Sequence, residues 1–378
     1  MRRERNLFYN TQIRVVGIGG GGSNAVNCMI TDGIQGAEFI SINTDYQSLA
    51  QSKATTRIQI GKQVTQGLGT GGNPGTGRRA VYEAGQEIKN ALRGADILFI
   101  ATCLGGGTGS GASPVVAQIA REMGILTIAI VTRPFRFEGH EPTRIAEQSI
   151  EELAKHVDSL IVFPNDRLLS LSNKQTSLID SFQLADKVLS QGVRIINEFV
   201  NRPGLLNVDF ADLKSVMANK GATLITVGRA KGANRDRIVA GSVMVCPILG
   251  LSIHGAKGML INITASSSLD LWEVQTITNI LRSTIREDAD FFLGTVVDEK
   301  MGEEIQVTVV ATGFSNEIWN MWSHTEQPRQ DNRSVFPCAI ESILDESDFP
   351  SESRNGSGFS LKNFPIPTFF MTFGDKSG

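Results

Sequence analysis

The sequence lacks the patterns that mark disulfide-rich, zinc-binding and membrane-spanning proteins. Its four cysteines (Cys28, Cys103, Cys246 and Cys338) form no Cys-x-x-Cys pair, and its four histidines are isolated. Neither a disulfide framework nor a metal-ligating cluster is therefore expected. No run approaches the roughly 20 apolar residues of a membrane span, and the basic segment 1–10 has no apolar core. We expect a cytoplasmic protein with no direct membrane insertion.

Two further features are absent. The sequence contains no Gly-x-x-x-x-Gly-Lys-Ser/Thr, so a Walker-type phosphate loop is excluded. A net charge of −3 gives no electrostatic reason to expect nucleic-acid binding. The 378 residues are enough for two domains of ordinary size and an additional segment.

The sequence is rich in glycine, with 39 residues. Residues 105–111 read Gly-Gly-Gly-Thr-Gly-Ser-Gly, between the apolar runs Ile97–Ala101 and Ala112–Val116. This pattern predicts a strand, then a turn with almost no side chains, then the start of a helix. In such an arrangement, the free backbone N–H groups point toward one position, where they can bind an anion. A flexible Gly/Ser linker is the alternative, but linkers are flanked by polar residues. The segment therefore predicts a phosphate-binding loop.

A second glycine cluster, residues 19–24, lies between the predicted strand Ile13–Ile18 and the predicted helix Ala25–Ile30. Glycines at 17, 19 and 22 satisfy Gly-x-Gly-x-x-Gly, and Asp45 lies about where a dinucleotide fold places its ribose carboxylate. An NAD-dependent oxidoreductase is therefore an alternative. That fold needs only one glycine loop, whereas two loops after two strands indicate a longer phosphate chain.

Strand-like apolar runs alternate with amphipathic stretches in the first half of the chain. The predicted strands are Ile13–Ile18, Phe39–Asn43, Ile97–Ala101, Leu126–Val131 and Leu160–Phe163. This alternation predicts a doubly wound parallel sheet with helices on both faces. Ligands of such sheets bind beyond the carboxyl ends of the strands, where both glycine clusters fall.

Residues 177–200 predict one long helix that opens with Ser177 and Asp180 as a capping box. Phe182 and Asp186 are four residues apart and share one face. A ring beside a carboxylate could hold a purine, and Asp186 could accept from the N1–H and amine of guanine. Without the glycine clusters, a core Phe182 and a solvated Asp186 would be the default interpretation.

The remainder predicts a second, mixed α/β domain. Its predicted strands and helices are Thr223–Val227, Asp236–Val245, Gly258–Ile263, Leu271–Thr284 and Ile305–Thr312.

The order of these features resembles FtsZ, the bacterial relative of tubulin. The resemblance rests on Gly19–Asn24, Asn43–Asp45, Gly105–Gly111, Asn165–Leu169, Phe182 with Asp186, and Asn207–Asp212. It implies an α/β, tubulin/FtsZ-like fold with an N-terminal doubly wound GTPase domain over residues 1–176. A long central helix at 177–202, a smaller α/β C-terminal domain at 203–314 and a disordered linker with a terminal peptide at 315–378 would follow.

The resemblance also implies a GTPase that polymerises head to tail at the division site and binds GTP or GDP with Mg²⁺. The implied GTP-binding residues are Gly19, Gly20, Gly21, Gly22, Ser23, Asn24, Asp45, Gly71, Gly72, Asn73, Gly105, Gly106, Gly107, Thr108, Gly109, Ser110, Glu138, Asn165, Phe182 and Asp186. Asn207, Asp209 and Asp212 would act in trans on the GTP of the next subunit. Exposed loop carboxylates without a role are the alternative for the two aspartates.

One position departs from the family pattern. The segment Arg133–Gly139 matches, but Pro142 stands where relatives have an arginine that contacts the phosphates. Loss of a charge-assisted contact costs about 1.5–3 kcal/mol. Arg144, two residues later, could substitute as a phosphate contact. We expect weaker GTP binding or slower turnover, and a structural paralogue that copolymerises with little hydrolysis is a further alternative.

Residues beyond Phe314 are rich in Ser, Asn, Pro and acidic residues, which predicts a disordered tether. Residues 363–370 resemble the terminal peptide by which FtsZ binds membrane-tethering division proteins, although the basic residues that normally follow are absent. The expected partners are therefore other copies of this chain and such tethering proteins.

Overall fold

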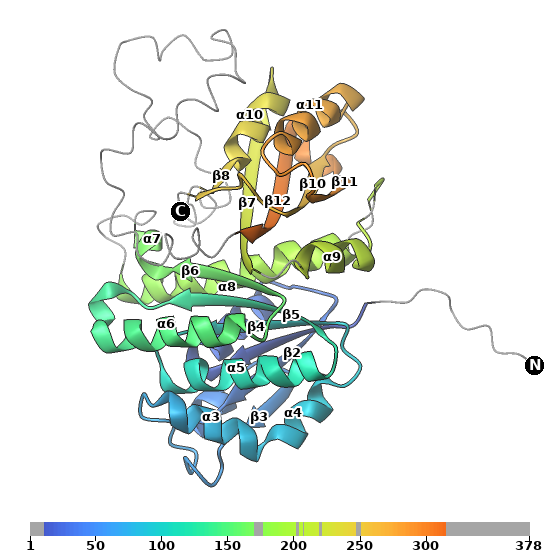
Figure 1. The fold of residues 1–378 in the computed structure, drawn as a ribbon. Helices are drawn as coiled ribbons and strands as arrows, with labels where there is room; N and C mark the ends of the chain where they lie inside the picture. The colour runs from blue at the N-terminus through green and yellow to red at the C-terminus, as the bar shows by residue number, and fades with distance from the viewer. Residues whose placement is uncertain are drawn as a thin grey trace, which may run out of the picture. The chain divides into compact units, whose positions relative to one another are not determined.

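The structure is a computed structural model that describes residues 11–169, 177–201, 204–206, 208–218, 221–246 and 251–314. The chain divides into two compact units, each described by itself below (Figure 1). One comprises Met1–Arg202 and Asp209–Gly221, and the other comprises Pro203–Val208 and Ala222–Gly378. The helix expected at 177–202 thus belongs to the first unit, while the domain limits expected from the sequence stay a prediction.

A parallel sheet forms the centre of the first unit. Its strands, in spatial order, are β3 (Thr56–Gln59), β2 (Ala37–Asn43), β1 (Ile13–Ile18), β4 (Ile97–Cys103), β5 (Leu126–Arg133) and β6 (Ser159–Pro164). Every pair in this series is parallel, so the carboxyl ends of the strands share one edge. The central strands are nearly continuous apolar runs because both of their faces are buried. Strand β3 was not predicted, since only Ile58 of its four residues is buried.

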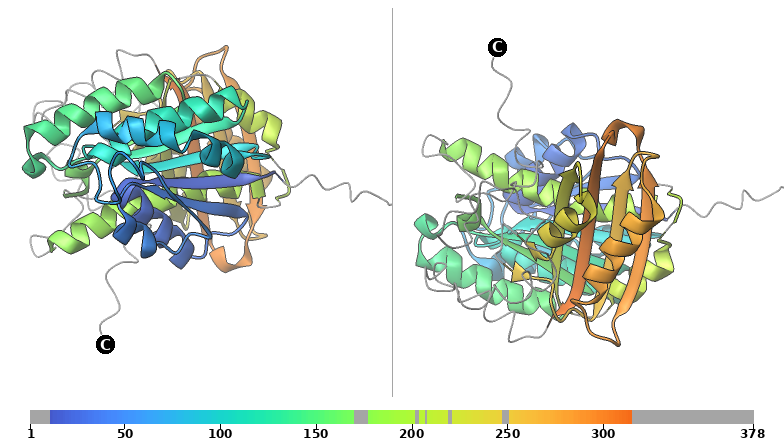
Figure 2. Two further views of the ribbon diagram at one scale, coloured as in Figure 1. Left: turned by 90° about the horizontal axis from the view of Figure 1, so that it is seen from below. Right: turned by 90° about the horizontal axis from the view of Figure 1, so that it is seen from above.

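Helices cover both faces of this sheet, which confirms the doubly wound prediction (Figures 1 and 2). Helices α5 and α6 lie on one face, where α5 also packs against α3 and α4, and α1 packs beside α8 on the other. The helices of this unit are α1 (Gly19–Thr31), α2 (Tyr46–Ala50), α3 (Pro74–Glu83), α4 (Gly85–Leu92), α5 (Gly107–Glu122), α6 (His140–Ala154), α7 (Asn165–Leu169), α8 (Leu178–Asn201) and α9 (Phe210–Met217), with the 3-10 turn η1 (Arg136–Glu138). No helix in the described ranges is both long and apolar enough to cross a membrane.

The glycine clusters differ from the sequence prediction, which placed them in loops. Helix α1 begins at Gly19 and α5 at Gly107, so most of these glycines form first helical turns. The reason is close packing. A Cβ on Gly17 would collide with the carbonyl oxygen of Gly22, and one on Gly21 would lie 2.6 Å from Cys103 Sγ. Glycine lets each helix start directly against the neighbouring strand ends.

The start of α8 follows the prediction. The Asp180 N–H donates to Ser177 Oγ at 3.1 Å, and the Ser177 N–H donates to Asp180 Oδ2 at 3.3 Å. These reciprocal bonds are a capping box, and they hold the N-terminal turn of the helix that presents Phe182 and Asp186.

The second unit is a mixed sheet with two helices on one face (Figure 2, right). Its sheet strands, in spatial order, are β11 (Asp290–Val297), β10 (Gly258–Ala265), β12 (Glu304–Phe314) and β7 (Gly221–Lys231). Strands β10 and β11 are parallel, and the other two pairs are antiparallel. The helices are α10 (Arg235–Val243) and α11 (Leu271–Arg282), accompanied by the short hairpin β8 (Val245–Cys246) and β9 (Leu251–Ser252) and the 3-10 turn η2 (Glu299–Met301). Strand β11 was not predicted, because four half-buried residues are followed by three buried ones and the burial does not alternate.

Candidate functional site

A pocket of about 400 Å³ opens at the carboxyl ends of β1 and β4 in the first unit. Its lining residues come from strand ends, the first turns of two helices and the N-terminal half of α8. They are Ile18, Gly19, Gly20, Gly21, Asn24, Thr70, Cys103, Leu104, Gly106, Gly107, Thr108, Gly109, Glu138, Asn165, Phe182, Ala185 and Asp186. This is the edge where parallel α/β sheets bind their ligands.

The starts of α1 and α5 form one end of the pocket. Their N-cap residues, Ile18 and Gly106, make no side-chain cap hydrogen bond. The first-turn N–H groups of both helices therefore remain for an anion, and both helix dipoles favour negative charge there. The two starts lie close together, because a Cβ on Gly19 would be 3.0 Å from the Gly109 nitrogen. Such an end suits a chain of phosphates.

Three threonine hydroxyls meet beside these helix starts. Thr108 Oγ1 lies 2.7 Å from Thr44 Oγ1 and 3.3 Å from Thr70 Oγ1. Thr70 and Thr108 line the pocket, whereas Thr44 is buried beneath them. Hydroxyl oxygens are hard ligands of the kind that Mg²⁺ accepts alongside phosphate and water.

The segment before α3 supports this end from outside the pocket. Asn73 caps α3, because its Oδ1 accepts from the Gly75 and Thr76 N–H groups at 2.8 and 3.4 Å. Helix α3 in turn packs tightly on α5, where a Cβ on Gly77 would collide with the Gly107 carbonyl oxygen. The position of Asn73 is thereby coupled to the first turn of α5.

The other end of the pocket has side chains suited to a purine base. Phe182 and Asp186 project from one face of α8, and the Phe182 ring meets Phe135 edge to face at 5.5 Å. The Asn165 side chain is only 4% exposed, and its Oδ1 has no hydrogen-bond partner. An unsatisfied buried acceptor of this kind is suited to a ligand donor.

The Asp186 carboxyl is strongly affected by its surroundings. Burial raises its pKa from 3.8 to about 7. Desolvation disfavours the charged form, so a ligand that donates hydrogen bonds to the carboxylate would be favoured at this position. The N1–H and amine of guanine are such donors.

Twelve of the predicted binding residues line the pocket: Gly19, Gly20, Gly21, Asn24, Gly106, Gly107, Thr108, Gly109, Glu138, Asn165, Phe182 and Asp186. The lining does not include Gly22, Ser23, Asp45, Gly71, Gly72, Asn73, Gly105, Ser110 or Arg144.

Two of the residues outside the lining support the site in other ways. The Asp45 carboxylate caps α2 by accepting from the Ser48 N–H at 3.0 Å. Ser110 Oγ accepts from the Gly105 N–H at 2.9 Å and so holds the turn that precedes α5.

Arg144 does not point into the pocket. It forms an ion pair with Glu141 at 2.5 Å, and its Nη1 donates to Gln148 Oε1 at 3.0 Å on the exposed face of α6. Pro142 instead packs against the turn that precedes α5, because a Cβ on Gly105 would lie 3.2 Å from the Pro142 carbonyl oxygen. The structure therefore brings Pro142, not Arg144, next to the glycine turn.

Four lining residues were not predicted, namely Ile18, Cys103, Leu104 and Ala185, and a fifth, Thr70, lies in the loop 69–77 that the resemblance places around the phosphates but was not itself named as a binding residue. Thr70 lies within a glycine-rich stretch, and Cys103 and Leu104 directly precede residues 105–111, so proximity to the motifs could have identified them. Ala185 precedes Asp186 in α8, and its small side chain gave no signal.

The predicted catalytic aspartates lie at the start of α9 and do not line the pocket. They form a capping box: the Asp212 N–H donates to Asp209 Oδ1 at 2.8 Å, and the Asp209 N–H donates to Asp212 Oδ2 at 3.2 Å. Each carboxylate retains a second oxygen for other contacts. Asn207 lies outside the described residues.

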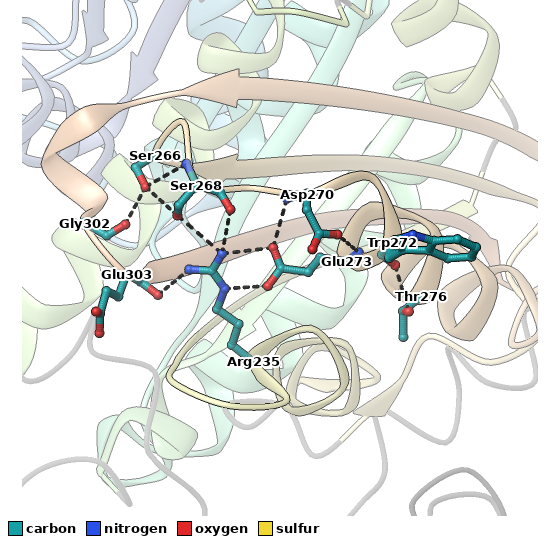
Figure 3. Close-up of polar contacts among 9 residues, drawn as sticks. All are labelled: Arg235, Ser266, Ser268, Asp270, Trp272, Glu273, Thr276, Gly302 and Glu303. Atoms are coloured by element: carbon teal, nitrogen blue, oxygen red, sulfur yellow. Dashed lines mark hydrogen bonds and ion pairs between the residues drawn. The ribbon is translucent and has the colours of Figure 1, made fainter.

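The second unit contains a polar network around Arg235 (Figure 3). Arg235 donates two hydrogen bonds to the Glu273 carboxylate at 2.6 and 2.9 Å, and a third to the Glu303 carbonyl oxygen at 2.7 Å. Glu273 also completes the capping box of α11 with Asp270. Trp272, in the same turn, projects away from Arg235 and is 74% exposed. The network thus fixes a helical turn that presents an indole to solvent.

Comparisons with known proteins agree with this fold. A family model described as the Tubulin/FtsZ family GTPase domain matches residues 12–173, and one described as the FtsZ family C-terminal domain matches residues 221–315. An empty FtsZ dimer from M. jannaschii is 38% identical, with a TM-score of 0.74 over 81% of this chain and 89% of that chain. A second M. jannaschii FtsZ structure, of a mutant, is 39% identical, with a TM-score of 0.73 over 80% and 91%.

A more distant structure shares the fold alone. CetZ2 from Haloferax volcanii, described as a GTPγS-bound protofilament, is 17% identical, with a TM-score of 0.72 over 83% of this chain and 96% of that chain. The resemblance to FtsZ that the sequence motifs indicated is confirmed by the more similar relatives. The chain belongs to the Tubulin/FtsZ family of GTPase cytoskeletal proteins.

Proposed function

We propose that this chain binds GTP in the pocket of its first unit and hydrolyses it within a head-to-tail polymer that acts in cell division. The observation that supports this best is that the two ends of the pocket differ in chemistry. Two uncapped helix starts form one end, and Phe182 with Asp186 forms the other. A guanine nucleotide is complementary to these two ends, because it has phosphates at one end and a base with hydrogen-bond donors at the other.

The roles follow from this orientation. The N–H groups of residues 19–21 and 106–109 bind the phosphates, Glu138 meets the ribose, and Asn24 and Asn165 with Phe182 and Asp186 hold the guanine. Gly22, Ser23, Asp45, residues 71–73, Gly105 and Ser110 shape and support these turns. Mg²⁺, when bound, would neutralise phosphate charge, with Thr108 and Thr70 as the hydroxyl groups placed to contact it or its waters.

Hydrolysis requires a group that orients the attacking water. Of the lining residues in the described ranges, only Glu138 and Asp186 are carboxylates, and Asp186 stands at the base end. The Asp209 and Asp212 carboxylates lie elsewhere, at the start of α9. We therefore assign them, with Asn207, to the GTP of the adjoining subunit, where each completes the site and orients water. Such an arrangement couples hydrolysis to assembly.

Exposed apolar side chains support self-association. In the first unit, Tyr46 and Leu68 are exposed beside the nucleotide-binding turns, and in the second unit Leu205, Leu271 and Trp272 are exposed. Two different surfaces that pair head to tail without closing a ring generate an open filament. We assign these two sets to the two sides of that interface.

The structural paralogue stays the second candidate. The observation that favours it is that Arg144 is held by Glu141 while Pro142 lies against the glycine turn. Such a chain would bind GTP and copolymerise but hydrolyse it poorly. An NAD-dependent oxidoreductase has no comparable support, since the chain matches a GTPase family.

The test is GTP hydrolysis measured against protein concentration. The rate per subunit should rise above a threshold concentration and should be lost in Asp212→Ala. Asp212→Asn is the matched variant, because an amide oxygen can keep the α9 cap while the charge is lost. If Asp212→Asn hydrolyses GTP at the wild-type rate, Asp212 does not act through its charge. Binding without hydrolysis at any concentration would support the structural paralogue.

We also propose that residues 363–370, which lie outside the described residues, bind membrane-tethering division proteins at the division site. A chain that lacks residues 363–378 should polymerise normally but lose that binding in a co-sedimentation assay with the tether on vesicles. Unchanged co-sedimentation would contradict this assignment.

A further inference from the structure

Two neighbouring loops of the first unit carry Glu138 and Asn165, which the proposed function assigns to the ribose and the guanine. One loop follows β5 and the other follows β6, and these strands are parallel, with Arg133 paired to Pro164 at their carboxyl ends. Asn165 comes directly after this pair, whereas Glu138 lies further along, in the η1 turn. The sheet pairing ends at Arg133 and Pro164, so a contact between the loops themselves must fix their separation.

The Asp166 carboxylate makes such a contact. Its Oδ1 accepts a hydrogen bond from the Arg136 backbone N–H at 3.1 Å, and its Oδ2 lies 3.4 Å from Arg136 Nε. Both oxygens of one carboxylate are thus directed to one residue of the other loop. Asp166 directly follows Asn165, and Arg136 belongs to the same turn as Glu138, so this contact joins the loops beside both ligand-binding side chains.

The turn on each side of this contact is held by interactions of its own. In η1, Glu138 Oε1 accepts from the Phe135 N–H at 2.8 Å, and the buried Phe135 ring meets Phe182 edge to face. In α7, the Leu168 and Asn165 side chains are both buried. Loss of the Arg136–Asp166 contact would therefore let the two turns separate without unfolding either of them.

The backbone hydrogen bond should contribute more to this contact than the ion pair does. The Arg136 side chain is 64% exposed and the Asp166 side chain 33% exposed, and ion pairs between exposed side chains contribute little. A hydrogen bond from a backbone N–H to a carboxylate is charge-assisted and acts on the main chain that carries Glu138. The Asp166 side chain should therefore matter more than the Arg136 side chain.

We propose that Asp166 is a positioning residue of the nucleotide site, which holds η1 against α7 so that Glu138 and Asn165 bind one nucleoside together. This inference rests on the proposed function and adds the residue that fixes the ribose and base contacts relative to each other. Two binding groups held at a fixed separation lose less conformational freedom when the ligand binds. Opening of the Arg136–Asp166 contact is then the local motion that releases the nucleotide.

The first experiment compares three variants by calorimetry with GDP and by release of labelled GDP into excess unlabelled GDP. In Asp166→Ala, affinity should fall about tenfold and release should be faster by a similar factor, because a charge-assisted hydrogen bond is lost. Asp166→Asn should recover most of the affinity, since an amide oxygen accepts from the same N–H. Arg136→Gln should stay within about twofold of the wild type, because it loses only the exposed ion pair. Thermal melting establishes that each variant folds.

The second experiment asks whether Asp166 acts through Glu138. In a double-mutant cycle, Asp166→Ala should weaken GDP binding less in a Glu138→Ala background than in the wild type, because the side chain that it positions is already missing. GTP and GDP should lose affinity by the same factor in Asp166→Ala, since the additional phosphate is bound at the other end of the pocket. A general disturbance of the pocket would change that ratio.

The outcomes separate this inference from the proposed function. If the wild type binds no guanine nucleotide, the proposed function fails and this inference fails with it. If the wild type binds GDP and Asp166→Ala releases it at the wild-type rate, the nucleotide site stands and the positioning role is refuted. An undiminished effect of Asp166→Ala in the Glu138→Ala background would also overturn it, as would a loss in Arg136→Gln equal to that in Asp166→Ala.

Discussion

The ionisation of Asp186 makes guanine binding depend on pH. Its pKa is raised to about 7 by burial, and only the ionised carboxylate accepts from both the N1–H and the amine of guanine. About one-tenth of the side chains are ionised at pH 6 and about nine-tenths at pH 8, so affinity should rise roughly tenfold between them, about 1.4 kcal/mol. Binding should release protons below pH 7, which calorimetry in buffers of different ionisation enthalpy detects.

The control is Asp186→Asn, because the terminal phosphate of the nucleotide also titrates near pH 6. The phosphate contribution persists in this variant, whereas the carboxylate contribution is lost, so the difference between the two pH profiles isolates Asp186. The amide of the variant should also favour xanthine, which carries a carbonyl in place of the guanine amine. A wild-type profile parallel to that of Asp186→Asn would refute the assigned role.

The same pKa has a consequence for the nucleotide-free protein. The folded-state pKa lies above the ordinary value of 3.8, so burial of Asp186 lowers the free energy of unfolding only when the carboxyl is ionised. The contribution of the protonated carboxyl to stability is fully present below about pH 4 and is lost as the pH rises through 7. The loss is at most about 4 kcal/mol for a shift of about three pKa units. Asp186→Asn should therefore melt at a higher temperature than the wild type at pH 8, with a smaller difference at pH 5.

Three further predictions concern packing and contacts. Gly17→Ala should destabilise the fold by about 1–3 kcal/mol in thermal unfolding, because its Cβ would collide with the first turn of α1. Arg235→Met should cost about 1–3 kcal/mol, because both partners of its ion pair are largely buried. That cost should shrink as the pH falls below about 4, because the pKa of Glu273 is lowered by its hydrogen bond from Arg235. Phe182→Ala should weaken guanosine binding about tenfold by loss of stacking.

Each of these has a matched control. Gly20→Ala should leave stability unchanged, since a Cβ there would meet nothing within 4 Å. Lys155→Met breaks an exposed ion pair with Glu152 and should cost about 0.5 kcal/mol or less. Phe137→Ala removes an exposed ring that does not line the pocket and should change guanosine affinity little. Equal effects in a variant and its control would contradict the corresponding assignment.

The sequence allowed the first sheet and most of the residues that line the pocket to be predicted, because both depend on local patterns. Strand β1 was predicted with its observed limits, since a buried parallel strand is a continuous apolar run bounded by glycine. Strands β3 and β11 were not, because neither has the alternating burial or the continuous buried run that reveals a strand. The helical state of Gly19–Gly22 was also not predicted, since helix propensity disfavours glycine and only tertiary packing explains it.

The prediction was weaker for side chains whose direction depends on neighbours. Asp45 has the sequence position of a ligand-binding carboxylate, and in the structure its Oδ1 accepts from the Ser48 N–H and caps α2, a contact that the spacing did not predict. Arg144 is close to the glycine turn in sequence, yet Glu141 holds it on the surface. Such choices depend on competing partners, which spacing alone does not reveal.

The two ends of the pocket differ in how readily their residues tolerate substitution. The phosphate end is formed largely by main-chain groups, and a methyl group would collide at Gly21, Gly107 and Gly109 of its lining. Substitutions there are selected against before they can alter phosphate binding. The base end is formed by the side chains of Glu138, Asn165, Phe182 and Asp186, and these can be exchanged without moving the backbone. Descendants of this sequence could therefore change the base that they recognise much more readily than the phosphate chain.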